Sequence, residues 1–306
     1  MDNVIVVLMQ LSIITINYNN AEGLRKTLAS VASQTYVEIE HIIIDGGSTD
    51  NSVEVIREYE ASLASRLCGV PENARDDLGC SSPLASRLKW ISEKDSGIYN
   101  AMNKGIRMAT SEYIQILNSG DILSDANVTQ RMIEYLEQIN SQHEKPIGIL
   151  YGNMIKVNAA GEIVGKSGYT EYSLRQFYSS TLNHDCAYIR AVLFEEYGLY
   201  DESLKIVSDW KWYLQAIGLG RVKPEYVDID VTIFDDGGIS ETNLELRNKE
   251  RRQVLEELLP PAVLWDYDTH AFEMEQMNRL RRWKLYPLVY FMERVLFKLE
   301  KWFCKR

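Results

Sequence analysis

Acidic and amide side chains follow several short apolar runs of the sequence, where strands could end. They occur at 17–19, 45–48, 92–95 and 118–121. Neither of the glycine-rich phosphate-binding motifs, G-x-G-x-x-G or G-x-x-x-x-G-K-[ST], is present. A phosphorylated ligand at these positions would therefore need a cation held by a carboxylate such as Asp121. Taken singly, each group is also typical of an ordinary turn.

The elements that would position these groups alternate between strands and helices. The runs with the composition of buried strands lie at 11–16, 39–44, 89–91 and 113–117. Between them, Leu24, Leu28 and Val31 share one helical face, and the segment 98–109 has a similar stripe. This alternation indicates a parallel sheet covered by helices, whose strands end at one edge. The predicted fold class is α/β, with the polar groups at that edge.

A duplicated stretch interrupts this alternation. The sequence Leu-Ala-Ser-Arg-Leu at 63–67 recurs at 84–88. Removing one copy would join the preceding helix directly to the strand at 89–91, so we expect 61–88 to be a surface insertion loop. Cys68 and Cys80 lie within it and have no predicted role.

The second half of the sequence is less regular. We expect strands at 147–155 and 226–234, a hairpin turn at 158–161, and helices at 173–180 and 207–217. From 241 onward the pattern is helical, with breaks at Pro260-Pro261 and at 266–268. We therefore expect one α/β domain at 1–240 and a helical region at 241–306.

The composition is that of a soluble globular protein. Of the 306 residues, 45% are apolar and 25% are charged, and the net charge of −11 argues against a uniformly basic nucleic-acid-binding surface. No apolar run reaches the roughly 18 to 20 residues of a membrane-spanning helix. The four cysteines form no C-x-x-C pair, so neither a zinc site nor a disulfide framework is predicted. We expect a cytoplasmic protein.

The C-terminal segment differs in charge from the rest. Nine Lys and Arg against two Glu give Arg279–Arg306 a charge of +7, and apolar residues recur there at helical spacing. One interpretation is a helix packed on its own domain. The other is an amphipathic helix lying on an anionic membrane surface.

Five of these motifs, taken in order, resemble family 2 glycosyltransferases. They lie at 12–20, 34–36, 45–50, 92–105 and 117–121. The stretch Ser-Glu-x-Asp-x-Gly-Ile-Tyr-x-Ala-Met-Asn-Lys-Gly and the later Leu-Asn-Ser-Gly-Asp are similar to the enzymes of bacterial capsule, exopolysaccharide and O-antigen assembly. The resemblance covers about 11–240. It implies a GT-A fold with a Rossmann-like nucleotide-sugar-binding sheet, and sugar transfer with inversion.

The resemblance also implies a donor site. A UDP-sugar is favoured and a GDP-sugar is possible, with the base between the end of the first strand and Asp45. The residues implied in nucleotide-sugar binding are Thr15, Ile16, Asn17, Tyr18, Asp45, Asp95, Asn103, Asn118 and Gly120. Asp121 would hold Mn²⁺ or Mg²⁺ with His184, although a structural role for this histidine stays open. Many relatives have an acidic residue where this chain has Gly120.

On the acceptor side, the resemblance implies Asp209 as the base that takes the proton from the acceptor hydroxyl. The same aspartate could instead serve as a helix cap. Trp210 would border the acceptor, and Gly237 and Gly238 would act as hinges of a loop that closes over the donor. The expected acceptor is a saccharide or a polyprenyl-linked sugar at the inner face of the cytoplasmic membrane. Two alternatives are a non-catalytic partner of another transferase and, less favoured, a nucleotidyltransferase.

Overall fold

The computed structural model describes residues 9–68, 84, 87–158, 160–168, 172–235, 243–282 and 286–303. The chain divides into two compact units, with the boundary between Arg251 and Arg252. Among the described residues, the first unit contains the sheet and the second contains α12 (Pro261–Arg281), α13 (Tyr286–Phe303) and the end of α11 (Leu244–Leu258) but no strand.

The strands form one nine-stranded sheet. They are β1 (Leu11–Asn17), β2 (Ile39–Asp45), β3 (Leu88–Ser92), β4 (Tyr113–Asn118), β5 (Ile122–Leu123), β6 (Ile149–Val157), β7 (Ile163–Ser167), β8 (Ala187–Arg190) and β9 (Glu225–Asp235). Their order is β3-β2-β1-β4-β8-β6-β9-β5, and β7 pairs with β6. The predicted parallel arrangement holds for β3, β2, β1 and β4, whereas β8 is antiparallel to its neighbours β4 and β6.

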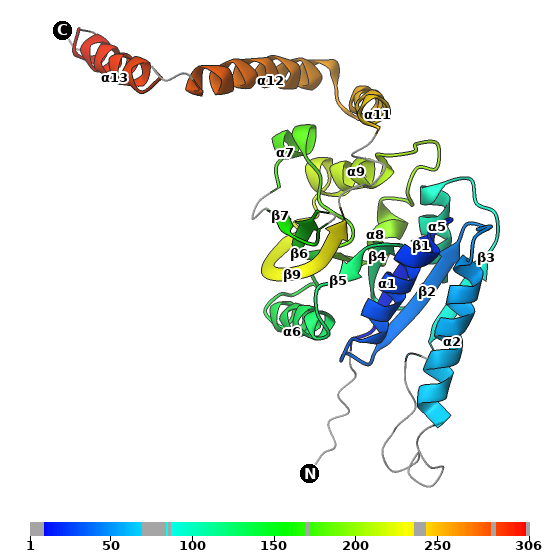
Figure 1. Cartoon of the computed structure of the whole chain (residues 1–306). Coiled ribbons are helices and arrows are strands. Elements are labelled where there is room, and N and C mark those ends of the chain that lie inside the picture. The colour runs from blue at the N-terminus through cyan, green and yellow to red at the C-terminus, as the bar shows by residue number, and fades with distance from the viewer. Residues whose placement is uncertain are drawn as a thin grey trace, which may run out of the picture. The chain divides into compact units, whose positions relative to one another are not determined.

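Helices α1 (Ala21–Ala32), α2 (Ser52–Cys68), α5 (Ile98–Met108) and α6 (Val128–Asn140) belong to this sheet region. Figure 1 shows α1 and α2 alongside β1, β2 and β3. The predicted apolar face of α1 is buried, with Leu24 and Leu28 packed against Ile43 of β2 and Ile56 of α2. Every residue of β1 and β2 is buried, including the polar residues that each strand contains beside its isoleucines.

The second half contains short helices and then long ones. They are α7 (Leu174–Ser179), α8 (Val192–Glu196), α9 (Ser208–Tyr213), the π-helical turn η1 (Leu214–Leu219), α11 (Leu244–Leu258), α12 (Pro261–Arg281) and α13 (Tyr286–Phe303). The predicted break at Pro260-Pro261 is confirmed, but the break at 266–268 is wrong because α12 continues through it. Asp268 is held by Arg252, whose Nη1 lies 2.9 Å from Oδ2. Among the described residues, no helix is long and apolar enough to cross a membrane.

The duplicated segment is not simply a loop. Its first copy continues α2, where Leu63 is 1% exposed, and its second copy ends with Leu88, the first residue of β3. The prediction of a loop over the whole of 61–88 is therefore wrong at both ends. Residues 69–83, including Cys80, and residues 85 and 86 lie outside the described residues.

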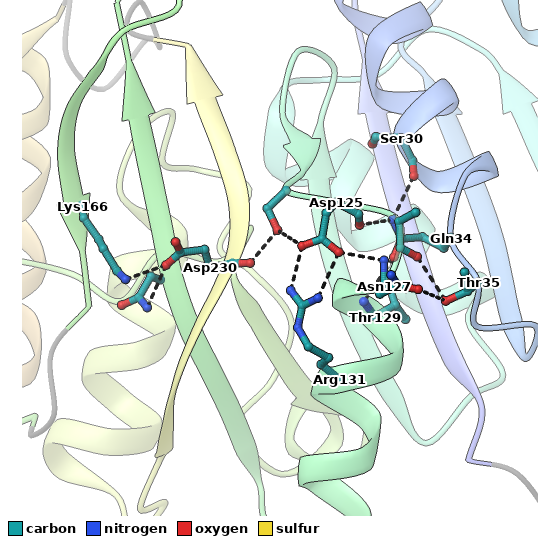
Figure 2. Close-up of polar contacts among 12 residues, drawn as sticks. Ser30, Gln34, Thr35, Asp125, Asn127, Thr129, Arg131, Lys166 and Asp230 are labelled. Atoms are coloured by element: carbon teal, nitrogen blue, oxygen red, sulfur yellow. Dashed lines mark hydrogen bonds and ion pairs between the residues drawn. The ribbon is translucent and has the colours of Figure 1, made fainter.

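The motif at 34–36 has a structural role at the end of α1 (Figure 2). Nε2 of Gln34 donates to the backbone oxygen of Asp125 (2.8 Å), and Oε1 of Gln34 accepts from the backbone nitrogen of Thr129 in α6 (3.1 Å). Asp125 in turn accepts two hydrogen bonds from Arg131, at 3.0 and 2.8 Å. The motif thus joins α1 to the start of α6, a helix that the sequence analysis did not predict.

Candidate functional site

A cavity of about 1190 Å³ opens in the first unit beyond the end of β4. Its walls include the β4–β5 turn, the segment before β8, the start of α9 and the first half of α11. The predicted site residues on these walls are Asn118, Gly120, Asp121, His184, Asp209 and Trp210. The structure therefore brings the predicted cation, base and acceptor residues into one cavity.

Asp121 is held in the turn between β4 and β5. Its Oδ2 accepts hydrogen bonds from the backbone nitrogen (3.0 Å) and the side-chain nitrogen (3.1 Å) of Asn118. Its backbone oxygen accepts from the Thr27 hydroxyl of α1 (2.7 Å). Burial raises the pKa of the Asp121 carboxyl, and the nearby Asp185 raises it further. A buried carboxyl of this kind is suited to a compensating positive charge.

Gly120 has a φ of +115°, a backbone conformation that residues with a side chain rarely adopt. Its backbone nitrogen donates to the Thr27 hydroxyl (2.9 Å), which fixes the turn to α1. The backbone geometry thus favours glycine at a position where the family resemblance leads us to expect an acidic residue. Asp121 keeps its place in the turn without that residue.

Asp209 lies in the first turn of α9 and is held by two partners from other elements. The hydroxyl of Tyr99 in α5 donates to its Oδ1 (2.8 Å), and Nδ1 of His184 lies 3.3 Å from its Oδ2. Nε2 of the same histidine lies 3.1 Å from the amide nitrogen of Asn118. A series of contacts therefore runs from Asp121 through Asn118 and His184 to Asp209.

The His184–Asp209 contact is a largely buried ion pair. Burial alone would lower the pKa of His184, but the hydrogen bond and charge of Asp209, together with nearby carboxylates, raise it to about 9. Burial alone would raise the pKa of Asp209, but His184 and then Tyr99 bring it below its usual value. The two shifts favour the charged form of each group at neutral pH. A cation could reach neither ring nitrogen of His184 without displacing one of its partners.

A second polar cluster surrounds Asp45 at the end of β2. The carboxylate accepts four hydrogen bonds, from the side chains of Asn17 (2.8 Å), Ser48 (2.6 Å) and Ser92 (2.7 Å) and from the Ser48 backbone (3.0 Å). Burial alone would raise the pKa of Asp45, but these donors lower it. Asp45 thus ties the ends of β1, β2 and β3 together.

Asp95 lies beside this cluster. A Cβ atom at Gly46 would collide with its Oδ2, so a larger residue there would require the Asp95 side chain to move. Burial raises the pKa of Asp95. Asp45 and Asp95 therefore form one polar edge, as the strand order predicts.

Other residues predicted to bind the nucleotide sugar lie elsewhere. The hydroxyl of Thr15 contacts the ring of His41 inside the sheet (3.0 Å), and Ile16 is 5% exposed. Asn103 is 1% exposed, and its amide bonds the backbone of Tyr200. The side chains of these three predicted residues lie inside the protein, whereas Tyr18 is 64% exposed at the end of β1.

Trp210 forms part of the cavity wall and is 1% exposed. Its indole nitrogen donates to the backbone oxygen of Phe177 in α7 (2.7 Å). Gly237 and Gly238, the predicted hinge residues, lie outside the described residues.

The first half of α11 also belongs to this site, which the sequence analysis did not predict. Glu250 accepts hydrogen bonds from the backbone nitrogens of Lys205 (2.8 Å) and Ile206 (2.9 Å), in the segment before α9. This anchor places Arg247 and Arg251 on the cavity wall. Tyr99 was missed as well, although it lies inside one of the recognised motifs.

Comparisons with known proteins agree with this geometry. The sequence profile of glycosyl transferase family 2 matches residues 12–198. An uncharacterized glycosyltransferase of Mycobacterium tuberculosis is 30% identical over 209 residues, which cover 67% of this chain and 68% of the relative. A PGL/p-HBAD biosynthesis glycosyltransferase of the same species is 25% identical over 232 residues, which cover 76% and 79%.

Solved structures share the fold at lower sequence identity. S. aureus TarS 1–349 in complex with UDP-GlcNAc matches with a TM-score of 0.57 at 17% identity, over 81% of this chain and 64% of that chain. The match to a longer TarS chain spans 41% of its length. A mannosyltransferase from Pyrobaculum calidifontis, in complex with GDP-Man and Mn²⁺, matches with a TM-score of 0.55 at 14% identity, over 95% and 86%. The predicted GT-A fold is confirmed.

We predict that Gly120→Ala lowers the free energy of unfolding by about 1–2 kcal/mol, because alanine is strained at this φ. Chemical denaturation measures the change. The matched control is Gly165→Ala in β7, where the nearest neighbour of the new Cβ is 3.9 Å away. Equal effects of the two substitutions would contradict a special backbone requirement at position 120.

We predict that His184→Gln destabilises the protein in a pH-dependent way. The pKa of His184 is raised on folding, so its stabilising effect is complete below its unfolded pKa of about 6.5 and is lost as the pH rises through about 9. The advantage of the wild type should shrink by roughly 3 kcal/mol between pH 6 and pH 10, since the shift from 6.5 to about 9 is worth about 1.4 kcal/mol per pKa unit. Urea unfolding at the two pH values measures it. The control is His143→Gln, which changes an exposed histidine and should give the same difference at both pH values.

Proposed function

The chain belongs to glycosyl transferase family 2 and is a glycosyltransferase, and on this premise we propose that Asp209 is its catalytic base. The acceptor oxygen forms a bond to the anomeric carbon of the donor sugar while the bond from that carbon to the diphosphate breaks. The electron pair leaves with the nucleoside diphosphate, the acceptor proton passes to Asp209, and the configuration inverts. The observation that carries the proposal is that the Asp209 carboxylate, held by Tyr99 and His184, shares one cavity with Asp121.

The partners of Asp209 support this role. The hydrogen bond from Tyr99 and the ion pair with His184 orient both carboxylate oxygens. The acceptor hydroxyl becomes acidic only as its bond to the sugar forms, so a carboxylate that stays ionised can take the proton in the transition state. Tyr99 and His184 act as positioning residues.

The proposed donor is a UDP-sugar, with a GDP-sugar as the second choice. The solved relatives were obtained with UDP, UDP-GlcNAc or GDP-Man. In this chain Asn17 and Tyr18 at the end of β1 would meet the nucleoside, beside the edge formed by Asp45 and Asp95. The hydrogen bonds of Asp45 support a role in holding this edge rigid.

Asp121 is the residue that would hold a divalent cation. Its buried carboxyl, with a pKa raised by burial and by Asp185, fits a cation that prefers oxygen ligands. The described residues contain no cluster of three or more His, Cys, Asp or Glu that could hold a metal ion, so the diphosphate and water would complete the coordination. Bound Mn²⁺ or Mg²⁺ supplies positive charge to the leaving diphosphate.

The proposed setting is the assembly of a bacterial surface polysaccharide, such as capsule, exopolysaccharide or O-antigen, at the inner face of the cytoplasmic membrane. Helix α13 supports a membrane location. Phe291 and Leu296 are 65% and 62% exposed, so the other residues of their own unit do not cover them. Basic residues accompany this apolar surface, as expected for a helix on an anionic membrane. The saccharide or polyprenyl-linked acceptor would be reached from there.

We predict that Asp209→Asn lowers kcat by about 10²- to 10⁴-fold, the usual contribution of a general base. Asparagine keeps the shape and can still bond Tyr99, so the affinity for the donor should change less than threefold. Release of nucleoside diphosphate from the donor that gives the fastest wild-type turnover measures both quantities.

The matched control is Asp201→Asn. This carboxylate also contacts α9, through Lys211 (2.9 Å), but it does not line the cavity. Its turnover should stay within about twofold of the wild type. Equal turnover of Asp209→Asn and the wild type would overturn the assignment of the base.

We predict that Leu296→Asp weakens binding of the full chain to vesicles of anionic phosphatidylglycerol by about tenfold, because an exposed apolar contact is replaced by a negative charge. Vesicle sedimentation measures the bound fraction. The control is Trp265→Asp in α12, which removes a side chain that is 72% exposed on another helix. Equal binding of the wild type and Leu296→Asp would argue against α13 as the membrane contact.

A further inference from the structure

The guanidinium of Arg251 lies on the wall of the cavity without a described acidic partner. Its Cζ is 5.0 Å from the centre of the Trp210 ring, so it is stacked on the residue that follows the proposed base. Among the residues that the structure describes, its Nε has no hydrogen-bond partner and no carboxylate forms an ion pair with it. The carboxylate of Asp209, the proposed base, is already bonded to Tyr99 and His184.

Two more cations line the same cavity. Arg247 precedes Arg251 by one helical turn of α11, and Lys205 comes from the segment before α9. Burial lowers the pKa of Arg251 and the charge of Arg247 lowers it further, while the charge of Asp209 raises it, so Arg251 lies within electrostatic range of both groups. Like charges held together in a partly buried wall favour the binding of an anion.

The position of these cations is fixed before any ligand binds. Both carboxylate oxygens of Glu250 accept hydrogen bonds from the backbone of Lys205 and Ile206. Glu250 is 6% exposed, so this anchor is shielded from water. Arg251 therefore presents its planar group at a set place, and guanidinium groups suit the two-point recognition of phosphate.

We propose that Arg251, with Arg247 and Lys205, binds a phosphate group of the acceptor, beside the sugar hydroxyl that faces Asp209. The proposal rests on the proposed function and deepens it, because it selects a phosphate-linked acceptor over a neutral saccharide. The diphosphate of a lipid-linked sugar has this chemistry.

The donor diphosphate is the other possible source of phosphate, and the geometry favours the acceptor. The donor diphosphate is expected at Asp121, where a cation would be held. Arg251 is stacked on Trp210, the residue next to Asp209, whereas Asp121 is joined to Asp209 only through Asn118 and His184. An anion at Arg251 would therefore lie beside the proposed base and not at the proposed cation residue.

The test measures binding of farnesyl diphosphate to the full chain by calorimetry, with farnesol as the uncharged counterpart. UDP or GDP with Mn²⁺ is present at saturation, so that the donor site is filled. The wild type should bind farnesyl diphosphate at least tenfold more tightly than farnesol. Arg251→Gln should weaken the binding of farnesyl diphosphate about tenfold and leave the affinity for farnesol and for the nucleotide unchanged.

Two further variants guard against a folding defect. Lys205→Gln changes an exposed side chain and should weaken the binding of farnesyl diphosphate about threefold. The matched control is Arg252→Gln, the neighbouring arginine, which pairs with Glu256 and Asp268 and should leave binding unchanged.

The proposal is overturned if the affinity for farnesyl diphosphate is the same in the wild type, Arg251→Gln and Lys205→Gln. It is also overturned if Arg251→Gln weakens nucleotide binding as much as it weakens farnesyl diphosphate binding, since the anion would then be the donor diphosphate. Failure of the proposed function has a different signature, which is unchanged turnover in Asp209→Asn.

Discussion

The buried ion pair between His184 and Asp209 holds together the parts of the molecule on which the chemistry depends. Asp209 belongs to α9, and His184 precedes β8, which pairs with β4 of the parallel half. Through Asn118, the histidine also reaches the turn that carries Asp121. Separating His184 from Asp209 would leave an unpaired charge in a poorly hydrated place. This cost opposes other positions of the two side chains. The proposed base and the proposed cation residue are thereby kept in one cavity.

The same arrangement explains why the site extends beyond the sheet. The first half of α11 also contacts α9 and the segment before it. Glu250 accepts hydrogen bonds from that segment, and Arg251 is stacked on Trp210 of α9. The compact first unit therefore reaches to Arg251, further than the domain limit at 240 that the sequence pattern suggests. One helix thus carries both Glu250, which supports the backbone before α9, and Arg247 and Arg251, which could bind an anion.

The parallel half was predictable because β1, β2 and β4 are almost entirely buried and the helix between β1 and β2 has one apolar face, so local patterns report the fold. The polar edge at Asp45 and Asp95 followed from the ends of those strands. Residue roles inside the motifs were less predictable: Thr15 and Asn103 bond protein groups within the core, and only three-dimensional contacts reveal this. Helix α6 was missed although Val128, Met132 and Leu136 recur at helical spacing. The sequence around α11 could not show that this helix belongs to the site, because Glu250 bonds backbone atoms more than 40 residues away.

The central claim is that this cavity and the polar edge at Asp45 and Asp95 together bind a nucleotide sugar with a divalent cation. A thermal-shift screen of the purified full chain against UDP-, GDP-, dTDP- and CMP-sugars, each with and without Mn²⁺, tests it most directly. We expect one nucleotide class, with UDP favoured, to raise the Tm in a manganese-dependent way, since a ligand at 100 times its Kd adds about 2.7 kcal/mol of stability. No shift with any of these donors, with or without Mn²⁺, would contradict the account.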